Sequence, residues 1–128
     1  MGDRQDRRIR VASIQMSMDD GGKGANLQRA AALIDGVDGA DLILLPEIWN
    51  VGYFAFEDYR AESESLSGPT VSMLREKAAA KGCFLFGGSI VEEEDGDYYN
   101  TSVLIDRNGG IAGTYRKIHL FGYQSEEA

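Results

Sequence analysis

The sequence has little of two things that would mark it as a secreted or membrane protein. It contains one cysteine, so no disulfide can form within the chain, and we expect a reducing, cytoplasmic location. No apolar run reaches the length that spans a bilayer, and residues 1–8 lack the apolar segment of a secretory signal. The first shortage argues against an oxidising, secreted setting, and the second argues against a protein that spans a membrane.

Basic residues are also in short supply. The chain has 13 lysines and arginines against 21 aspartates and glutamates, which gives a net charge of −8. This excess of negative charge argues against nucleic acid or an anionic membrane surface as the main partner. With 128 residues, 43% of them hydrophobic, the sequence fits one globular domain over residues 9–128, behind a flexible polar tail at residues 1–8.

The most informative stretch is residues 41–47, an apolar run that ends in a proline and a carboxylate. Four aliphatic residues at 42–45 indicate a short strand buried on both faces, and Pro46 should end it because proline cannot donate to a sheet ladder. Glu47 then lies just past the strand, where open α/β sheets bind ligands. A glutamate there suits proton transfer, but taken alone it fits a surface position equally well.

The first two thirds of the chain alternate between strand and helix patterns. Residues 9–16 alternate in polarity as a strand does. After a loop at 19–24, Asn26 is a good N-cap for an amphipathic helix. A β-α-β-α-β order predicts a parallel sheet. The expected elements are strand 9–16, helix 26–36, strand 42–45, helix 69–82 and strand 83–91.

The last third changes to hairpins. Residues 92–97 form a charged turn, whose spacing is not that of an EF-hand metal loop, so we interpret it as a solvated hairpin tip. Strands are expected at 98–105 and 111–116, joined by an Asn-Gly turn at 108–109. Lys117 follows the last strand directly. Without a partner it would be interpreted as a solvated lysine at a strand end.

An aromatic-rich segment follows Glu47. Residues 48–56 contain four aromatic side chains, among them Tyr53, around a central glycine. Such a loop could wall a pocket and exclude water, which makes Tyr53 a candidate substrate-binding residue. The alternative is that its aromatic rings pack into the core.

Two motifs together resemble the nitrilase superfamily, the carbon–nitrogen hydrolases. They are Leu-Leu-Pro-Glu, ending at Glu47, and Tyr-Arg-Lys-Ile-His-Leu-Phe, which contains Lys117. Supporting matches are Val-Ala-Ser-Ile-Gln-Met in the first strand, Ala-Asn-Leu in the first helix, Gly-Gly-Ser in the third strand and Asn-Thr-Ser-Val-Leu-Ile-Asp in the fourth. The similarity runs from about Ile9 to about Tyr123.

This resemblance implies an α-β-β-α sandwich and a Glu-Lys-Cys catalytic set. By position, Glu47 would be the general base that takes a proton from a cysteine thiol and later from water. Lys117 would stabilise the oxyanion formed at an amide or nitrile carbon. The implied substrate is a small amide, cleaved at a non-peptide C–N bond, with no metal and no organic cofactor.

The sequence departs from the family at the nucleophile. In the family, the cysteine lies a few dozen residues beyond the lysine, and this chain contains none there. Cys83 opens a buried apolar strand and is expected to be an inert hydrophobic residue. A Cys83–His119 dyad lacks any sign of an orienting third group. We therefore expect the N-terminal half of an α-β-β-α hydrolase, with no nucleophile of its own.

Several possibilities stay open on the sequence alone. The chain can be a truncated product, a subunit completed by a second polypeptide or a degenerate copy. It is expected either to form a homo-oligomer or to be completed by a second half, because half a sandwich exposes sheet surface. The alternative to an amidase is a catalytically inactive module that binds a partner subunit.

Overall fold

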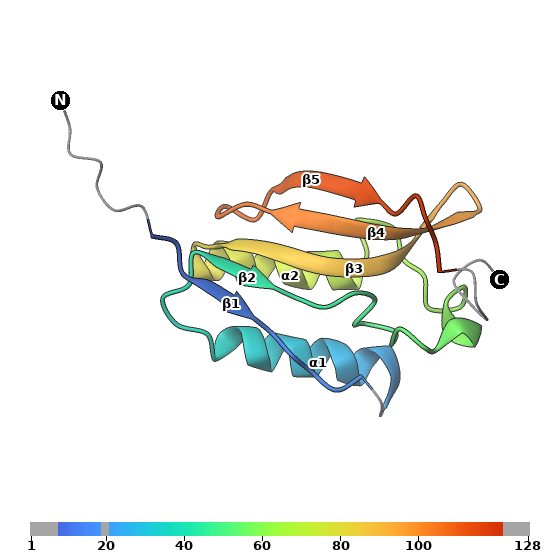
Figure 1. Ribbon diagram of the computed structural model, residues 1–128, viewed down its shortest axis with the longest axis horizontal. Helices are drawn as coiled ribbons and strands as arrows, with labels where there is room; N and C mark the ends of the chain where they lie inside the picture. The colour runs from blue at the N-terminus through green and yellow to red at the C-terminus, as the bar shows by residue number, and fades with distance from the viewer. Residues whose placement is uncertain (1–7, 19–20, 122–128) are drawn as a thin grey trace.

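The computed structural model describes residues 8–18 and 21–121, so all but the last residue of the predicted tail at residues 1–8 lies outside the described residues. Helices and strands alternate along the chain and then give way to a run of strands (Figure 1). The elements are β1 (Val11–Ser13), α1 (Gly22–Asp35), β2 (Leu42–Leu44), the 3₁₀ turn η1 (Phe56–Asp58), α2 (Pro69–Lys81), β3 (Phe84–Glu94), β4 (Asp97–Ile105) and β5 (Ile111–Arg116).

The strands form one sheet in the order β1-β2-β3-β4-β5. β1, β2 and β3 are parallel, with Ala12 beside Ile43 and Ile43 beside Leu85. β4 and β5 are antiparallel to their predecessors, with Leu85 beside Ile105. The predicted β-α-β-α-β order followed by hairpins is therefore confirmed.

One face of the sheet carries the hydrophobic core, and both helices pack on it. The side chains of Ile43 and Leu85 are fully buried there, in register with Ile105. The helices contribute apolar residues at helical spacing. The core comprises Ala30, Ile34, Ile43, Leu45, Trp49, Val71, Leu74, Ala78, Cys83, Leu85, Ile90, Val103 and Ile105.

The opposite face of the sheet is not covered by a helix in the described part of the chain. Alternation along the strands places Phe84, Phe86 and Leu104 on this side, and each is half-buried. Tyr115 on β5 is 58% exposed. The expectation that residues 42–45 are buried on both faces is thus wrong for Leu42 and Leu44, which are half-buried on the open side.

α2 matches the prediction, whereas α1 does not begin where expected. Pro69 opens α2, and Gly82 ends it with a φ of 60°. α1 starts at Gly22, after Gly21 as N-cap with a φ of 91°, so Asn26 is not the cap. Asn26 is fully buried inside the helix, and its amide donates to the Asn50 carbonyl at 2.9 Å. The hydrogen bond to Asn50, and not a capping role, therefore explains why an asparagine stands at position 26.

The charged run at residues 92–97 is mostly strand. β3 continues to Glu94 and β4 begins at Asp97, which leaves only Asp95 and Gly96 as the turn. Glu92 is buried, so the interpretation of the whole run as a solvated tip is wrong at that residue. No helix in the described part of the chain is long and apolar enough to cross a membrane.

Candidate active site

Glu47 and Lys117 meet at one edge of the sheet. Glu47 follows β2, Lys117 follows β5, and the Lys117 Nζ lies 3.0 Å from the Glu47 Oε1. The Glu47 side chain is 46% exposed and that of Lys117 is 30% exposed, so both are reachable from solvent. The structure therefore brings together the two residues that the sequence singled out.

Asn100 on β4 holds both members of this pair. Its side-chain amide Nδ2 donates to the Glu47 Oε1 at 2.9 Å. Its main-chain carbonyl accepts the Lys117 N–H at 2.8 Å. Among the described residues, the Asn100 amide and the Lys117 ammonium both donate to Oε1 of Glu47, which leaves Oε2 able to accept a proton.

The two residues after Glu47 are each bonded to β3. The N–H of Ile48 donates to Ser89 Oγ at 3.0 Å, and the Trp49 Nε1 donates to the Gly87 carbonyl at 2.8 Å. Ile48 has a φ of 45°, an unusual value for a β-branched side chain. Such backbone strain persists only where the surroundings enforce it.

A β-bulge in β3 makes room for the turn at Glu47. The register of β3 against β4 shifts between Phe86 and Ser89. Within the bulge, Gly88 has a φ of 62°, and a Cβ there would lie 1.8 Å from the Pro46 carbonyl oxygen. Only glycine permits this approach, because any side chain would collide with the Pro46 peptide.

A cavity of about 220 Å³ opens beside Glu47 and Lys117 on the face of the sheet away from the helices. Asn100 also borders a neighbouring cavity of about 360 Å³, which Arg60 and three tyrosines line in part. The first cavity is lined by Leu45, Glu47, Phe86, Gly88, Ser89, Asn100, Ser102, Tyr115 and Lys117. Together the two cavities offer room for a small substrate beside the carboxylate and the ammonium group.

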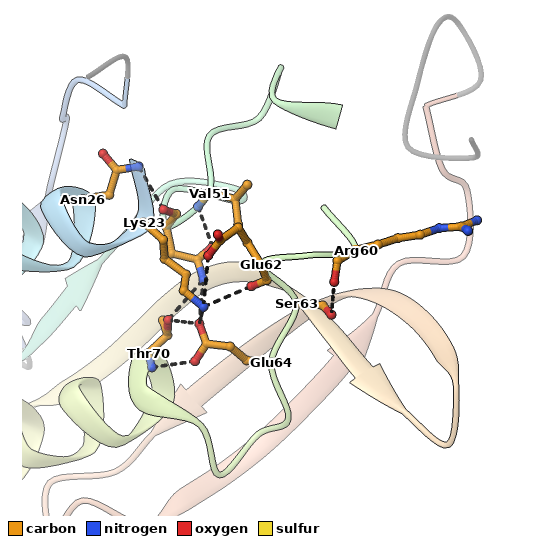
Figure 2. Close-up of polar contacts among 9 residues, drawn as sticks. Lys23, Asn26, Val51, Arg60, Glu62, Ser63, Glu64 and Thr70 are labelled. Atoms are coloured by element: carbon orange, nitrogen blue, oxygen red, sulfur yellow. Dashed lines mark hydrogen bonds and ion pairs between the residues drawn. The ribbon is translucent and has the colours of Figure 1, made fainter. Parts of the chain in front are cut away.

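A buried glutamate anchors the segment that follows Glu47 (Figure 2). Glu64 Oε1 accepts the Thr70 N–H at 2.8 Å, and Oε2 accepts the Thr70 hydroxyl. The Asn50 Nδ2 and the Lys23 Nζ each lie 3.2 Å from Oε2. Glu64 thereby joins the start of α1, the start of α2 and the residue three positions past Glu47.

Glu92 on β3 is a second buried carboxylate, and its partners come from β4 and β5. Glu92 accepts hydrogen bonds from Thr101 Oγ1 at 2.7 Å and from Arg116 Nε and Nη2, each at 3.0 Å. Burial raises the pKa of Glu92, but the hydrogen bonds from Arg116 and Thr101 and the charge of Arg116 outweigh it and lower the pKa overall. The ionised Glu92 therefore fixes Arg116, the residue next to Lys117.

The structure separates the remaining candidate residues from this cavity. Tyr53 lies in an aromatic cluster, edge-on to Phe54 and Phe56, and is not among the described residues that line the cavity. Cys83 precedes β3 and His119 follows β5, and these two strands run in the same direction. The two residues thus lie at opposite ends of the sheet and form no dyad.

Sequence reasoning missed the roles of Asn100 and Ser89. Both belong to motifs that carry the family resemblance, Asn-Thr-Ser and Gly-Gly-Ser, but no structural role was predicted for either residue. Paired glycines inside a strand do signal a bulge or a close backbone approach, which is what Gly88 provides. Asn100 gave no comparable signal, because its partner Glu47 lies 53 positions away.

The described residues contain no group of three or more histidines, cysteines, aspartates or glutamates that could hold a metal ion. What the site does present is a carboxylate with one oxygen held by two donors, and an ammonium group. This arrangement can move a proton and stabilise a developing negative charge.

Comparison with known proteins gives consistent matches. The family model for carbon-nitrogen hydrolase matches residues 10–128. The 2-oxoglutaramate amidase of Paenarthrobacter nicotinovorans is 38% identical over 105 residues, which are 79% of this chain and 36% of that protein. The omega-amidase NIT2 of Danio rerio is 39% identical over 103 residues, or 77% of this chain and 36% of that protein. The chain thus spans little more than a third of these relatives.

Solved structures agree. Nit3 of Saccharomyces cerevisiae, a member of branch 10 of the nitrilase superfamily, superposes with a TM-score of 0.80 at 32% identity, over 93% of this chain and 46% of its own. XC1258 of Xanthomonas campestris, a CN-hydrolase superfamily protein, gives a TM-score of 0.82 at 27% identity, over 93% of this chain and 44% of its own. With its motifs, its sheet and the match of the family model, this chain belongs to the carbon–nitrogen hydrolases of the nitrilase superfamily.

Proposed function

We propose that this chain supplies the base and the oxyanion-stabilising cation of an amidase that hydrolyses non-peptide C–N bonds of a small amide. The observation that carries the proposal is the 3.0 Å approach of the Lys117 Nζ to the Glu47 Oε1, beside a cavity. The relatives named 2-oxoglutaramate amidase and omega-amidase support an amide rather than a nitrile as substrate.

The reaction begins with a thiol that is deprotonated as it attacks the amide carbon. Glu47 Oε2 takes the thiol proton, a C–S bond forms, and the carbonyl oxygen becomes an oxyanion near the Lys117 ammonium. The C–N bond then breaks, and Glu47 returns the proton to the departing nitrogen. A water molecule then attacks the thioester carbon, and Glu47 accepts its proton. The C–S bond breaks, and Glu47 returns that proton to the departing sulfur, which releases the acid and restores the thiol.

The thiol in this scheme does not come from Cys83. Cys83 is the only cysteine of the chain, and it is buried at the end of the sheet opposite Lys117. The nucleophile must therefore be provided by polypeptide outside these 128 residues. A consequence is that the chain alone should release no ammonium from small amides.

A chimera tests the proposal. Residues 10–121 of this chain replace the aligned segment of the Paenarthrobacter 2-oxoglutaramate amidase, and ammonium release from 2-oxoglutaramate is measured. We expect Glu47→Gln and Lys117→Ala each to lower kcat by a factor of about 10² to 10⁴. Glu76→Gln, an exposed position on α2, is the matched control and should change little.

Full activity in the Glu47→Gln chimera would refute the proposal. For the 128-residue chain alone, ammonium release that Glu47→Gln abolishes and Cys83→Ala spares would show that a group other than a thiol is the nucleophile. In either case, circular dichroism of the variants must first show that they fold.

The open sheet face favours a second candidate function, a module that binds a partner subunit. Phe86 and Leu104 are half-buried there, and Tyr115 is 58% exposed. An apolar sheet face of this kind is normally covered by another layer. Static light scattering on the purified chain distinguishes the cases: a homo-oligomer supports pairing of the open faces, whereas a stable, cooperatively folding monomer counts against it.

A further inference from the structure

Both peptide groups that flank Glu47 are bonded to the same residue, Ser89. The Ser89 N–H donates to the Pro46 carbonyl at 3.3 Å. The Ser89 Oγ accepts the Ile48 N–H at 3.0 Å, within the buried interior. One residue on β3 therefore holds the main chain immediately before and immediately after the candidate base.

The bond to Ile48 is the more consequential of the two. Ile48 is completely buried and has a φ of 45°, a strained conformation for a β-branched residue. Ile48 lies outside the helices and strands, so its N–H has no place in a ladder, and Ser89 Oγ is what prevents a buried, unsatisfied donor. The hydroxyl thus stabilises the strained conformation that directs Glu47 toward Asn100 and Lys117.

The bulge in β3 explains how Ser89 reaches this position. Gly88 lies against the Pro46 peptide with no room for a Cβ, and the register shift there turns Ser89 toward the Glu47 turn. The next residue is fixed independently, because the Trp49 indole donates to Gly87 within the same bulge. One segment of β3 therefore holds the turn by hydrogen bonds at Pro46, Ile48 and Trp49.

We propose that Ser89 is a positioning residue of the active site, which acts by holding the Glu47 turn so that Glu47 Oε1 stays on Asn100 and Lys117. This inference rests on the function proposed above, and it adds a residue that does not itself touch the reacting atoms. Loss of the hydroxyl leaves the Ile48 N–H without an acceptor, so the peptide between Glu47 and Ile48 is expected to rotate. A carboxylate displaced by about 1 Å can lose a factor on the order of 10² in rate.

The first measurement is made on the 128-residue chain and needs no activity. The Asn100 side-chain amide, which donates to Glu47, reports the position of the carboxylate in a ¹⁵N-resolved NMR spectrum. In Ser89→Ala we expect its resonance to move toward that seen in Glu47→Ala, and we expect the Ile48 amide to exchange faster with solvent. Ser89→Thr, which keeps an Oγ, should leave both signals near their original values.

Ile34→Val is a control whose expected loss of stability is similar to that of Ser89→Ala. Ile34→Val removes one buried methylene from α1, on the other side of the sheet, at a cost similar to that of one hydrogen bond. It should leave the Asn100 and Ile48 signals unchanged. A shift of both signals in Ile34→Val as large as in Ser89→Ala would mean that general destabilisation moves them, and it would overturn the proposal.

The second measurement uses the chimera with the amidase. Ser89→Ala is expected to lower kcat by about 10- to 100-fold with little change in KM, and Ser89→Thr is expected to recover most of it. If Glu47→Gln abolishes activity while Ser89→Ala leaves kcat unchanged, the positioning role is wrong and the proposed function stands. If Glu47→Gln is itself active, the proposed function fails, and the NMR result still decides whether Ser89 holds the turn.

Discussion

Lys117 donates a hydrogen bond to Glu47 across 70 residues of sequence. The two residues follow β5 and β2, and the strands β3 and β4 lie between these in the sheet and position both side chains. Glu47 is placed by the end of β2 and by the bulge in β3. Lys117 is placed by its N–H bond to Asn100 on β4. The pair is thus a product of the assembled sheet.

The Glu47–Lys117 pair should matter for chemistry far more than for stability. Both side chains are partly exposed, and such pairs contribute at most about 1 kcal/mol. We expect Lys117→Met to change the free energy of unfolding by less than that, as measured by urea denaturation. Lys77→Met, which breaks a comparable exposed pair with Asp35, is the control. A loss above about 3 kcal/mol, the scale of a buried pair, would show that Lys117 supports the fold itself.

Gly88→Ala should be severely destabilising. The new Cβ would lie 1.8 Å from the Pro46 carbonyl oxygen, so β3 must separate from the Glu47 turn. We expect a loss of at least about 4 kcal/mol, or failure to fold. Gly82→Ala is a matched control, because Gly82 has nearly the same φ of 60° and a Cβ added there would meet nothing within 4 Å. It isolates the backbone cost of about 1–2 kcal/mol. Equal losses in the two variants would contradict the clash.

Glu64→Gln should destabilise the protein by about 3–5 kcal/mol, because it leaves Lys23 facing a neutral amide in a buried network. The new NH₂ group would also oppose the donors of Asn50 and Thr70. Glu62→Gln is the control, since Glu62 is 43% exposed and lies 3.6 Å from the same Lys23 Nζ. Chemical denaturation measures both. Similar small losses of stability in Glu64→Gln and Glu62→Gln would mean that the charge of Glu64 contributes little to the free energy of unfolding.

Glu92 should make stability depend on pH in the acid range. Although burial raises the pKa of Glu92, its bonds to Arg116 and Thr101 bring the pKa below the usual value. Its ionised form therefore contributes stability at neutral pH. That contribution is lost as the pH falls from about 4.3 through the lower pKa of the folded state. Glu92→Gln should flatten the decline of unfolding free energy below about pH 5, whereas exposed Glu57→Gln should leave it unaltered.

Cys83 should be unreactive in the folded protein. Burial raises the pKa of its thiol, and although Lys81 and Arg107 lower it and Asp41 raises it, the net shift is upward. Thiols react as thiolates, so modification by a disulfide reagent should wait for unfolding. The rate should rise with urea in parallel with the unfolded fraction. Fast labelling without urea would place Cys83 at the surface.

Local patterns predicted the elements whose ends are set by nearby residues. α2 begins at Pro69 and ends before Gly82, and β5 has the bounds that were predicted for it after the Asn-Gly turn. The start of α1 was missed because a glycine in the left-handed region supplies the N-cap, whereas Asn26 is occupied by a contact with Asn50. A residue that is well suited to a local role, such as N-cap, can instead be placed by a hydrogen bond to a residue far away in the sequence.

The site was predictable only in part, for the same reason. Glu47 and Lys117 were paired through a family resemblance, not through any spacing that their positions reveal. The acidic run at 92–97 was interpreted as solvated, because nothing near it in sequence shows that Arg116 buries one of its glutamates. Asn100 and Ser89 bond to the Glu47 turn across 53 and 41 residues, so only the folded sheet brings these partners near.

The helices and the candidate site occupy opposite faces of the sheet, and this has a practical value. Positions such as Glu76 and Ala80, exposed on α2, point away from the cavity that holds Glu47. A dye or a tether attached there leaves that cavity unobstructed. The molecule could be immobilised on a sensor through its helical side, with the open face presented to whatever polypeptide or small molecule is offered to it.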